Sequence, residues 1–267
     1  MIRIPVVSGS FYPFEKDKLL GLLKVYLTTQ EKEERAKLVI APHAGYIYSG
    51  HVAGAVFSSV YVPDNILLLG PNHTGLGSRF SIMLEGEWKT PLGNVPINSK
   101  LAEIIKNKNK LFEDDYMAHA EEHSLEVQLP FLQYKNPKIT IVPIAIKHAE
   151  YERLKELGIS IASALEEFGE ETLIVVSSDM SHYIAQEEAK KKDFIALDRI
   201  LNLDALGLLE VCFNYDITMC GVFPTVVGIE AVKTLGAKDA KLIKYATSGD
   251  INKDYHRVVG YAGVIVK

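Results

Sequence analysis

The chain has 267 residues, of which 48% are hydrophobic and 24% charged, and its formal net charge is −5. This composition is typical of a soluble globular protein with a sizeable core, and it provides no overall attraction to nucleic acid or to an anionic membrane. Because no apolar run reaches the ~20 residues that cross a bilayer, and residues 1–10 lack the pattern of a secretory signal, we expect a cytoplasmic protein that binds neither nucleic acid nor membrane.

The first elements expected are a helix and two strands that each lead into a histidine. Apolar residues at helical spacing predict a helix over residues 14–29, and the charged stretch 31–37 indicates a solvated linker. Two apolar runs, residues 38–41 and 66–69, then predict buried strands. His43 follows the first strand and His73 follows the second, each beside glycine or proline.

Between and after these strands the pattern predicts shorter elements. Residues 44–50, rich in glycine and tyrosine, are expected to form a loop. Ser49 is typical of a helix N-cap and predicts a helix over residues 51–60. Residues 80–97 resemble short strands joined by turns.

A second group of histidines precedes an apolar helical segment. His119 and His123 are four residues apart, which on one helix would place both on the same face, as in helical zinc pairs. The motif His-Glu-x-x-His is absent, because Glu121 and Glu122 stand at other offsets. The alternative is that His123 and Glu126 cap a helix start or support neighbouring ligands.

The carboxyl-terminal half alternates strands and helices, which predicts an α/β protein made of one domain, residues 1–267. The two cysteines, Cys212 and Cys220, are too few for a disulfide framework. The expected strands cover residues 139–146, 173–176, 241–247 and 257–266, and the expected helices cover residues 151–168, 187–201, 204–213 and 222–235.

The chain is organised around the stretch that follows the strand 173–176. It reads Ser-Ser-Asp-Met-Ser-His-Tyr and contains Asp179 and His182, three residues apart, so that Asp179 can orient the imidazole of His182. In proteins with an open α/β sheet, ligands bind at the carboxyl ends of the strands. We therefore expect His43, His73 and His182 to converge at one edge of a shared sheet.

These side chains suit a metal site. His43, His73 and Cys220 would supply three protein ligands and leave coordination positions open, and imidazole with thiolate suits iron, copper or zinc. His182 would then serve as a general acid or base, oriented by Asp179. Two alternatives remain open: Asp179 or His182 is a fourth ligand, or these are core histidines with structural roles.

Several motifs together resemble the Memo family, which includes the human mediator of cell motility and the prokaryotic AmmeMemoRadiSam system protein B. The resemblance implies a fold similar to class III extradiol dioxygenases, with a central mixed β-sheet flanked by helices on both faces. The motifs are Ser-Gly-Ser-Phe-Tyr-Pro (8–13), Ala-Pro-His-Ala-Gly-Tyr-Ile-Tyr-Ser-Gly (41–50), Gly-Pro-Asn-His (70–73), Glu-His-Ser-Leu-Glu (122–126), Ser-Ser-Asp-Met-Ser-His (177–182) and Cys-Gly (220–221).

The resemblance also implies roles for individual residues. His43, His73 and Cys220 match the family's metal-binding positions, and Asp179 and His182 match its other cleft residues. Cys220 stands where the dioxygenase relatives have a glutamate. The residues that we assign to support the ligands are His123, Glu126 and Tyr46.

Two functions follow from this assignment. The first is a metal-dependent redox protein that uses iron or copper, with zinc as an alternative, on a small molecule of unknown identity. The second is a non-catalytic accessory protein that binds a peptide or partner and works with radical SAM and AMMECR-type proteins. The open coordination positions favour the first, and the missing carboxylate ligand favours the second.

Overall fold

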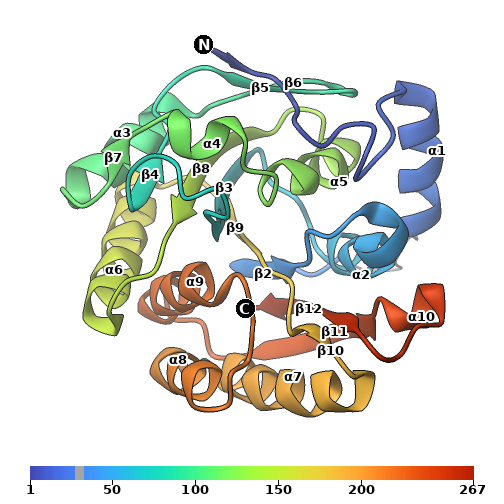
Figure 1. The fold of residues 1–267 in the computed structure, drawn as a ribbon. Helices are drawn as coiled ribbons and strands as arrows, with labels where there is room; N and C mark the ends of the chain where they lie inside the picture. The colour runs from blue at the N-terminus through green and yellow to red at the C-terminus, as the bar shows by residue number, and fades with distance from the viewer. Residues whose placement is uncertain (28–32) are drawn as a thin grey trace.

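The computed structural model describes residues 1–27 and 33–267. Within them, nine strands form one mixed sheet and three more form a small sheet beside it (Figure 1). The nine are β2 (Leu38–Ala41), β3 (Asn65–Pro71), β4 (Phe80–Ile82), β7 (Glu113–Asp114), β8 (Thr140–Ile146), β9 (Thr172–Ser177), β10 (His182–Ile184), β11 (Ala240–Thr247) and β12 (Val258–Val266), and the three are β1 (Ile2–Arg3), β5 (Glu87–Thr90) and β6 (Gly93–Pro96).

The order of strands in the large sheet is β10-β12-β2-β9-β3-β8-β4-β7, with β11 paired to β12. The four central strands β2, β9, β3 and β8 are parallel, whereas β12 and β4 run antiparallel to their central neighbours. The expected α/β fold with a mixed sheet is confirmed. Because the central strands are parallel, the residues that follow β2, β3 and β9 emerge at the same edge of the sheet.

Helices cover both faces of this sheet. The helices are α1 (Lys16–Tyr26), α2 (Tyr46–Ser59), α3 (Ser99–Lys108), α4 (Met117–Ala120), α5 (Leu129–Lys135), α6 (Tyr151–Phe168), α7 (Gln186–Leu201), α8 (Ala205–Asn214), α9 (Val222–Thr234) and α10 (Gly249–Asn252), with a 3₁₀ turn at Glu126–Gln128. On one face α2 packs on β2, β11 and β12, and on the other face α9 packs on β2, β3, β8 and β9. No described helix has the length and apolar character that a membrane crossing requires.

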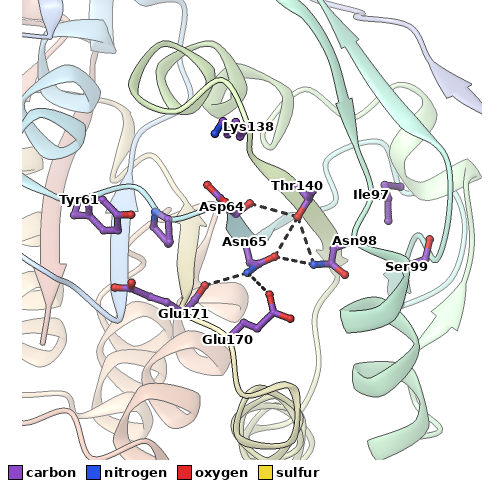
Figure 2. A pocket seen from close by; sticks show the side chains of 11 residues that line it. Tyr61, Asp64, Asn65, Ile97, Asn98, Ser99, Lys138, Thr140, Glu170 and Glu171 are labelled. Atoms are coloured by element: carbon purple, nitrogen blue, oxygen red, sulfur yellow. Dashed lines mark hydrogen bonds between the residues drawn. The ribbon is translucent and has the colours of Figure 1, made fainter.

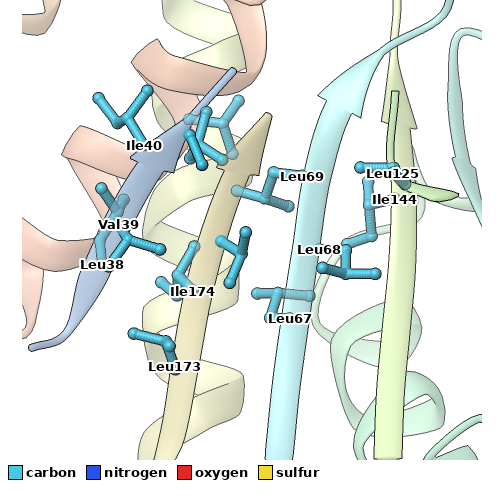
Figure 3. Close-up of a cluster of buried hydrophobic side chains, with 14 of the residues drawn as sticks. Leu38, Val39, Ile40, Leu67, Leu68, Leu69, Leu125, Ile144, Leu173 and Ile174 are labelled. Carbon is cyan, nitrogen blue, oxygen red and sulfur yellow. The ribbon is translucent and has the colours of Figure 1, made fainter. Parts of the chain in front are cut away.

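The core lies where the central strands are covered on both faces. Leu38, Leu67 and Ile174 come from three neighbouring strands and are fully buried together (Figure 3). The continuous apolar runs follow from this double burial, because both faces of each strand need apolar side chains. Burial of each such side chain stabilises the folded state by about 1.5–3 kcal/mol. The sheet is therefore a rigid base for the loops at its edge.

Most expected elements of the carboxyl-terminal half are confirmed, and two boundaries near the amino terminus differ. Helix α2 begins at Tyr46 rather than near residue 51, since Gly45 is the N-cap and the Tyr46 amide donates to the Phe11 carbonyl at 2.8 Å. Helix α1 is shorter than residues 14–29. The end of that predicted helix and the start of the predicted linker fall on residues 28–32, outside the described part of the chain.

Candidate metal centre

Three histidine rings meet at the carboxyl edge of the sheet. His43 lies two residues beyond β2, His73 two residues beyond β3, and His123 in the irregular segment after α4. The ring centroid of His43 is 5.2 Å from that of His73 and 5.5 Å from that of His123, and His73 and His123 stack at 4.8 Å. One nitrogen from each ring lies within 4.8 Å of the other two. This histidine cluster (His43, His73 and His123) could hold a metal ion.

The cluster forms without the helical pairing of His119 and His123 that their spacing suggested. Helix α4 ends at Ala120, so that the two residues do not share a helix. His119 is instead fully buried against Trp88, with ring centroids 5.8 Å apart. The structure therefore excludes the helical pair, which was one of two alternatives, and His123, which we placed around the ligands, joins the cluster itself.

The tautomer of His43 follows from its hydrogen bonds. His43 Nδ1 is 2.9 Å from Ser177 Oγ, which donates its own hydrogen to the Ser124 carbonyl at 2.6 Å. Because Ser177 has no second hydrogen, His43 Nδ1 must be the donor. Its Nε2 then carries a free lone pair, the form that binds a metal. Burial, reinforced by the neighbouring histidines, lowers the pKa of His43, which keeps the ring neutral.

His73 is fixed in the same way by a buried carboxylate. Glu122 is fully buried, and its Oε1 accepts from His73 Nδ1 at 2.9 Å while its Oε2 accepts from the His73 amide at 2.5 Å. Burial raises the pKa of Glu122, but the hydrogen bonds from His73 and Ser124 outweigh it and hold the pKa at about 2. An ionised carboxylate only accepts, so His73 Nδ1 carries a hydrogen and Nε2 is the ring nitrogen left to bind a metal.

Cys220 lies directly beside the cluster. Its Sγ is 3.2 Å from His43 Nε2 and accepts from the Asp179 amide at 3.2 Å. The next residue must be Gly221, because a Cβ there would stand 2.4 Å from Ser178 Cβ. Burial, and then the charge of Asp179, raise the pKa of the Cys220 thiol. Without a bound cation, Cys220 is therefore a thiol that donates towards His43.

Asp179 and His182 are close to the site but do not pair as expected. Asp179 Oδ1 accepts from the His43 amide at 2.8 Å, and burial raises the pKa of this carboxyl to about 6. His182 is held by Thr218 instead: its Nδ1 donates to the Thr218 carbonyl at 2.9 Å and its amide to Thr218 Oγ1 at 2.8 Å. The carbonyl cannot donate, so His182 Nδ1 carries a hydrogen and Nε2 is the ring nitrogen that has no partner from Thr218. The predicted orientation of His182 by Asp179 was wrong, and Thr218 was missed.

Glu126 and Tyr46 lie behind the cluster. Glu126 is fully buried and accepts from Arg3 Nη1 at 2.5 Å and from the Tyr12 hydroxyl at 2.7 Å. Tyr46 is buried and its hydroxyl donates to the Val127 carbonyl at 2.6 Å. Both contact the backbone or side chains that support the site. The sequence did not indicate Arg3, the partner of Glu126.

A pocket lies at the opposite edge of the sheet from the histidine cluster, where β3, β8 and β9 begin (Figure 2). Its volume is about 660 Å³. Asn98 Nδ2 donates to Asn65 Oδ1 at 2.8 Å, and Asn65 Nδ2 donates to the Glu171 carbonyl at 3.3 Å. These groups satisfy one another, so they contribute to the fold rather than to a reactive centre.

The fold and the site define an α/β protein with a histidine cluster that could hold a metal ion, at the carboxyl edge of a mixed sheet. The chain belongs to the Memo family, whose model, described as Memo-like protein, matches residues 3–265. It is 45% identical to a MEMO1 family protein of Aquifex aeolicus (99% of this chain, 98% of the relative) and 40% identical to one of Methanopyrus kandleri (100% and 99%).

A solved structure shares the fold. It is that of an uncharacterized protein from Escherichia coli K12, with a TM-score of 0.56 at 12% sequence identity, over 86% of this chain and 100% of that one. At this identity the likeness extends to the fold alone.

Proposed function

We propose that this Memo-family protein is a metal-dependent redox protein that holds iron or copper between His43, His73 and Cys220 and acts on a small molecule. The observation that carries the proposal is the arrangement of hydrogen bonds behind the two imidazoles. Ser177 and Glu122 accept the Nδ1 hydrogens of His43 and His73, so Nε2 is the nitrogen that each ring has left to bind a metal. Metal-binding histidines are usually held in this way, with the second ring nitrogen donating to a fixed acceptor.

The donor set fits the proposed ion. Imidazole and thiolate together suit iron, copper and zinc, and three protein ligands leave positions open for substrate. His123 is the alternative third ligand, since it completes the histidine cluster. Bound iron or copper would supply one-electron redox chemistry and a Lewis acid.

Two neighbouring residues, His182 and Asp179, would transfer protons and position a ligand. His182 presents Nε2 while Thr218 holds its Nδ1 hydrogen, so His182 is suited to accept and return a proton. Asp179 accepts a hydrogen bond from the backbone amide of His43 and thereby fixes that ligand at the end of its strand.

Elemental analysis of protein purified anaerobically tests the proposal. We expect close to one iron or copper per chain in the wild type, and its loss in His43→Ala and Cys220→Ser. His182→Ala should keep the metal. His148→Ala is the matched control, because His148 is exposed and packs on Phe223 outside the cluster. Full metal content in both ligand variants would refute the assignment.

Calorimetry in buffers of different ionisation enthalpy distinguishes the third ligand. A metal ligand must be deprotonated, and the raised pKa of Cys220 keeps its thiol protonated before binding. Zinc uptake should therefore release about one proton from Cys220 if Cys220 binds. His123 should release none if it takes that place, because burial lowers the pKa of its ring. A folded wild type that takes up no iron, copper or zinc would favour the accessory protein that binds a peptide or partner.

A further inference from the structure

One buried arginine connects the amino-terminal arm, residues 3–12, to the segment that supports the histidine cluster. Arg3 is fully buried, and its guanidinium donates in three directions. Nε donates to the His119 carbonyl at 2.9 Å, Nη2 to the Glu122 carbonyl at 2.6 Å, and Nη1 to the Glu126 carboxylate at 2.5 Å. The guanidinium holds these three acceptors through a rigid, planar set of donors, whereas a lysine would offer three donors on a flexible stem.

The charge of Arg3 is matched by Glu126, which also accepts hydrogen bonds from the rest of the arm. The Glu126 carboxylate that pairs with Arg3 also accepts from the Val6 amide at 2.8 Å, the Val7 amide at 3.1 Å and the Tyr12 hydroxyl at 2.7 Å. A buried ion pair with every lone pair in use is costly to assemble, and replacing such pairs with apolar residues is often neutral or stabilising. Stability alone is therefore a weak reason for this arrangement.

The contacts of the arm lead directly to the cluster. Arg3 donates to the backbone carbonyl of Glu122, and the side-chain carboxylate of the same Glu122 orients His73. Further along the arm, the Phe11 ring lies edge-on to the His123 ring, with centroids 5.1 Å apart. Residues 121–125 contain no helix or strand to hold them in place. Their geometry therefore depends on side chains from outside, and Arg3 supplies the donors.

We propose that Arg3 and the arm 3–12 are positioning residues of the histidine cluster, which set the orientation of the His73 and His123 rings and so the affinity of the site for a metal ion. The part that concerns metal affinity rests on the proposed function. The part that concerns ring orientation does not.

The experiment compares Arg3→Lys with Arg35→Lys. Arg35 is the matched control because it also pairs with a glutamate, Glu171, and lies over a tyrosine ring, Tyr61, at 4.8 Å, but is exposed and remote from the cluster. The measurements are ¹⁵N NMR of the labelled histidines in metal-free protein and a titration with Co²⁺ alone. In Arg3→Lys we expect the His73 signals to leave the single tautomer with hydrogen on Nδ1, and Co²⁺ affinity to fall about tenfold.

The outcomes separate the two proposals. A folded Arg3→Lys protein with the histidine signals and Co²⁺ affinity of Arg35→Lys would overturn the inference. If Arg3→Lys does not fold, Phe11→Leu takes its place: the inference requires shifted His123 signals and is refuted by unchanged ones. A wild type that binds no Co²⁺, with His73 signals that still respond in Arg3→Lys, would count against metal binding and support the positioning role.

Discussion

Glu122 provides the sharpest test of how the site is built. In Glu122→Gln the side chain keeps its shape but replaces one acceptor with a donor. In the wild type the His73 amide donates to a Glu122 carboxylate oxygen at 2.5 Å. If the glutamine oxygen faces His73 Nδ1 and the Ser124 amide, the new NH₂ group takes the place of that acceptor and faces the His73 amide, donor against donor. If the amide is flipped, NH₂ opposes Nδ1, and His73 must move its hydrogen to Nε2. Either arrangement leaves a buried donor unpaired or removes the lone pair for a metal.

The magnitude follows from the pKa. Glu122 titrates at about 2 instead of its usual 4.5, so its ionised form contributes roughly 3 kcal/mol to folding. Because the folded pKa is the lower one, this contribution is complete above pH 4.5 and is lost as the pH falls towards 2. At pH 7, Glu122→Gln should lower the free energy of unfolding by about 2–3 kcal/mol and weaken metal binding by about 10–100-fold.

Urea unfolding monitored by circular dichroism, together with a zinc titration, measures both effects. Glu121→Gln is the control, because Glu121 is next to Glu122 in the chain but its carboxylate is exposed. Surface substitutions of this kind change the free energy of unfolding by about 0.5 kcal/mol at most. Equal unfolding free energies and equal zinc affinities in the two variants would refute the reasoning.

The remaining predictions concern His119 and two glycines. Burial lowers the pKa of His119 from 6.5 to about 4, so the unfolded chain binds a proton that the folded chain does not, and stability should fall by up to about 3 kcal/mol between pH 6.5 and pH 4. Urea unfolding over this range should show a flatter profile for His119→Phe, and a profile as steep as that of the wild type would contradict the assignment. Gly158→Ala should destabilise by about 1–3 kcal/mol, because its Cβ would meet the Val227 carbonyl oxygen on α9 at 2.7 Å. Gly21→Ala, in open space on α1, should stabilise by about 0.5–1 kcal/mol, and thermal unfolding that ranked the two alike would argue against the α6–α9 packing.

The sequence was sufficient to predict the sheet and the two strand-end histidines. Apolar runs marked the strands, and parallel strands necessarily bring the residues after them to one edge. His43 and His73 therefore followed from local patterns combined with a general rule of topology.

The partners of these histidines could not be predicted in the same way. Glu122 reaches His73 across 49 residues, and Thr218 reaches His182 across 36. Both lie in irregular segments, where periodicity carries no information. Spacing also misled at Asp179, because a gap of three residues in a loop does not determine where a side chain points, and Asp179 turns to the amide of His43.

The position of β12 has a consequence for how the protein matures. This strand, from residues 258–266, pairs with β2, from residues 38–41, and the Gly260 carbonyl accepts from the Met180 amide in the loop between Asp179 and His182. Pairings this distant in sequence form late and slowly. On the ribosome, the loop beside the cluster would stay unsupported until β12 has been synthesised and has docked, so a metal ion would find a complete site only after translation.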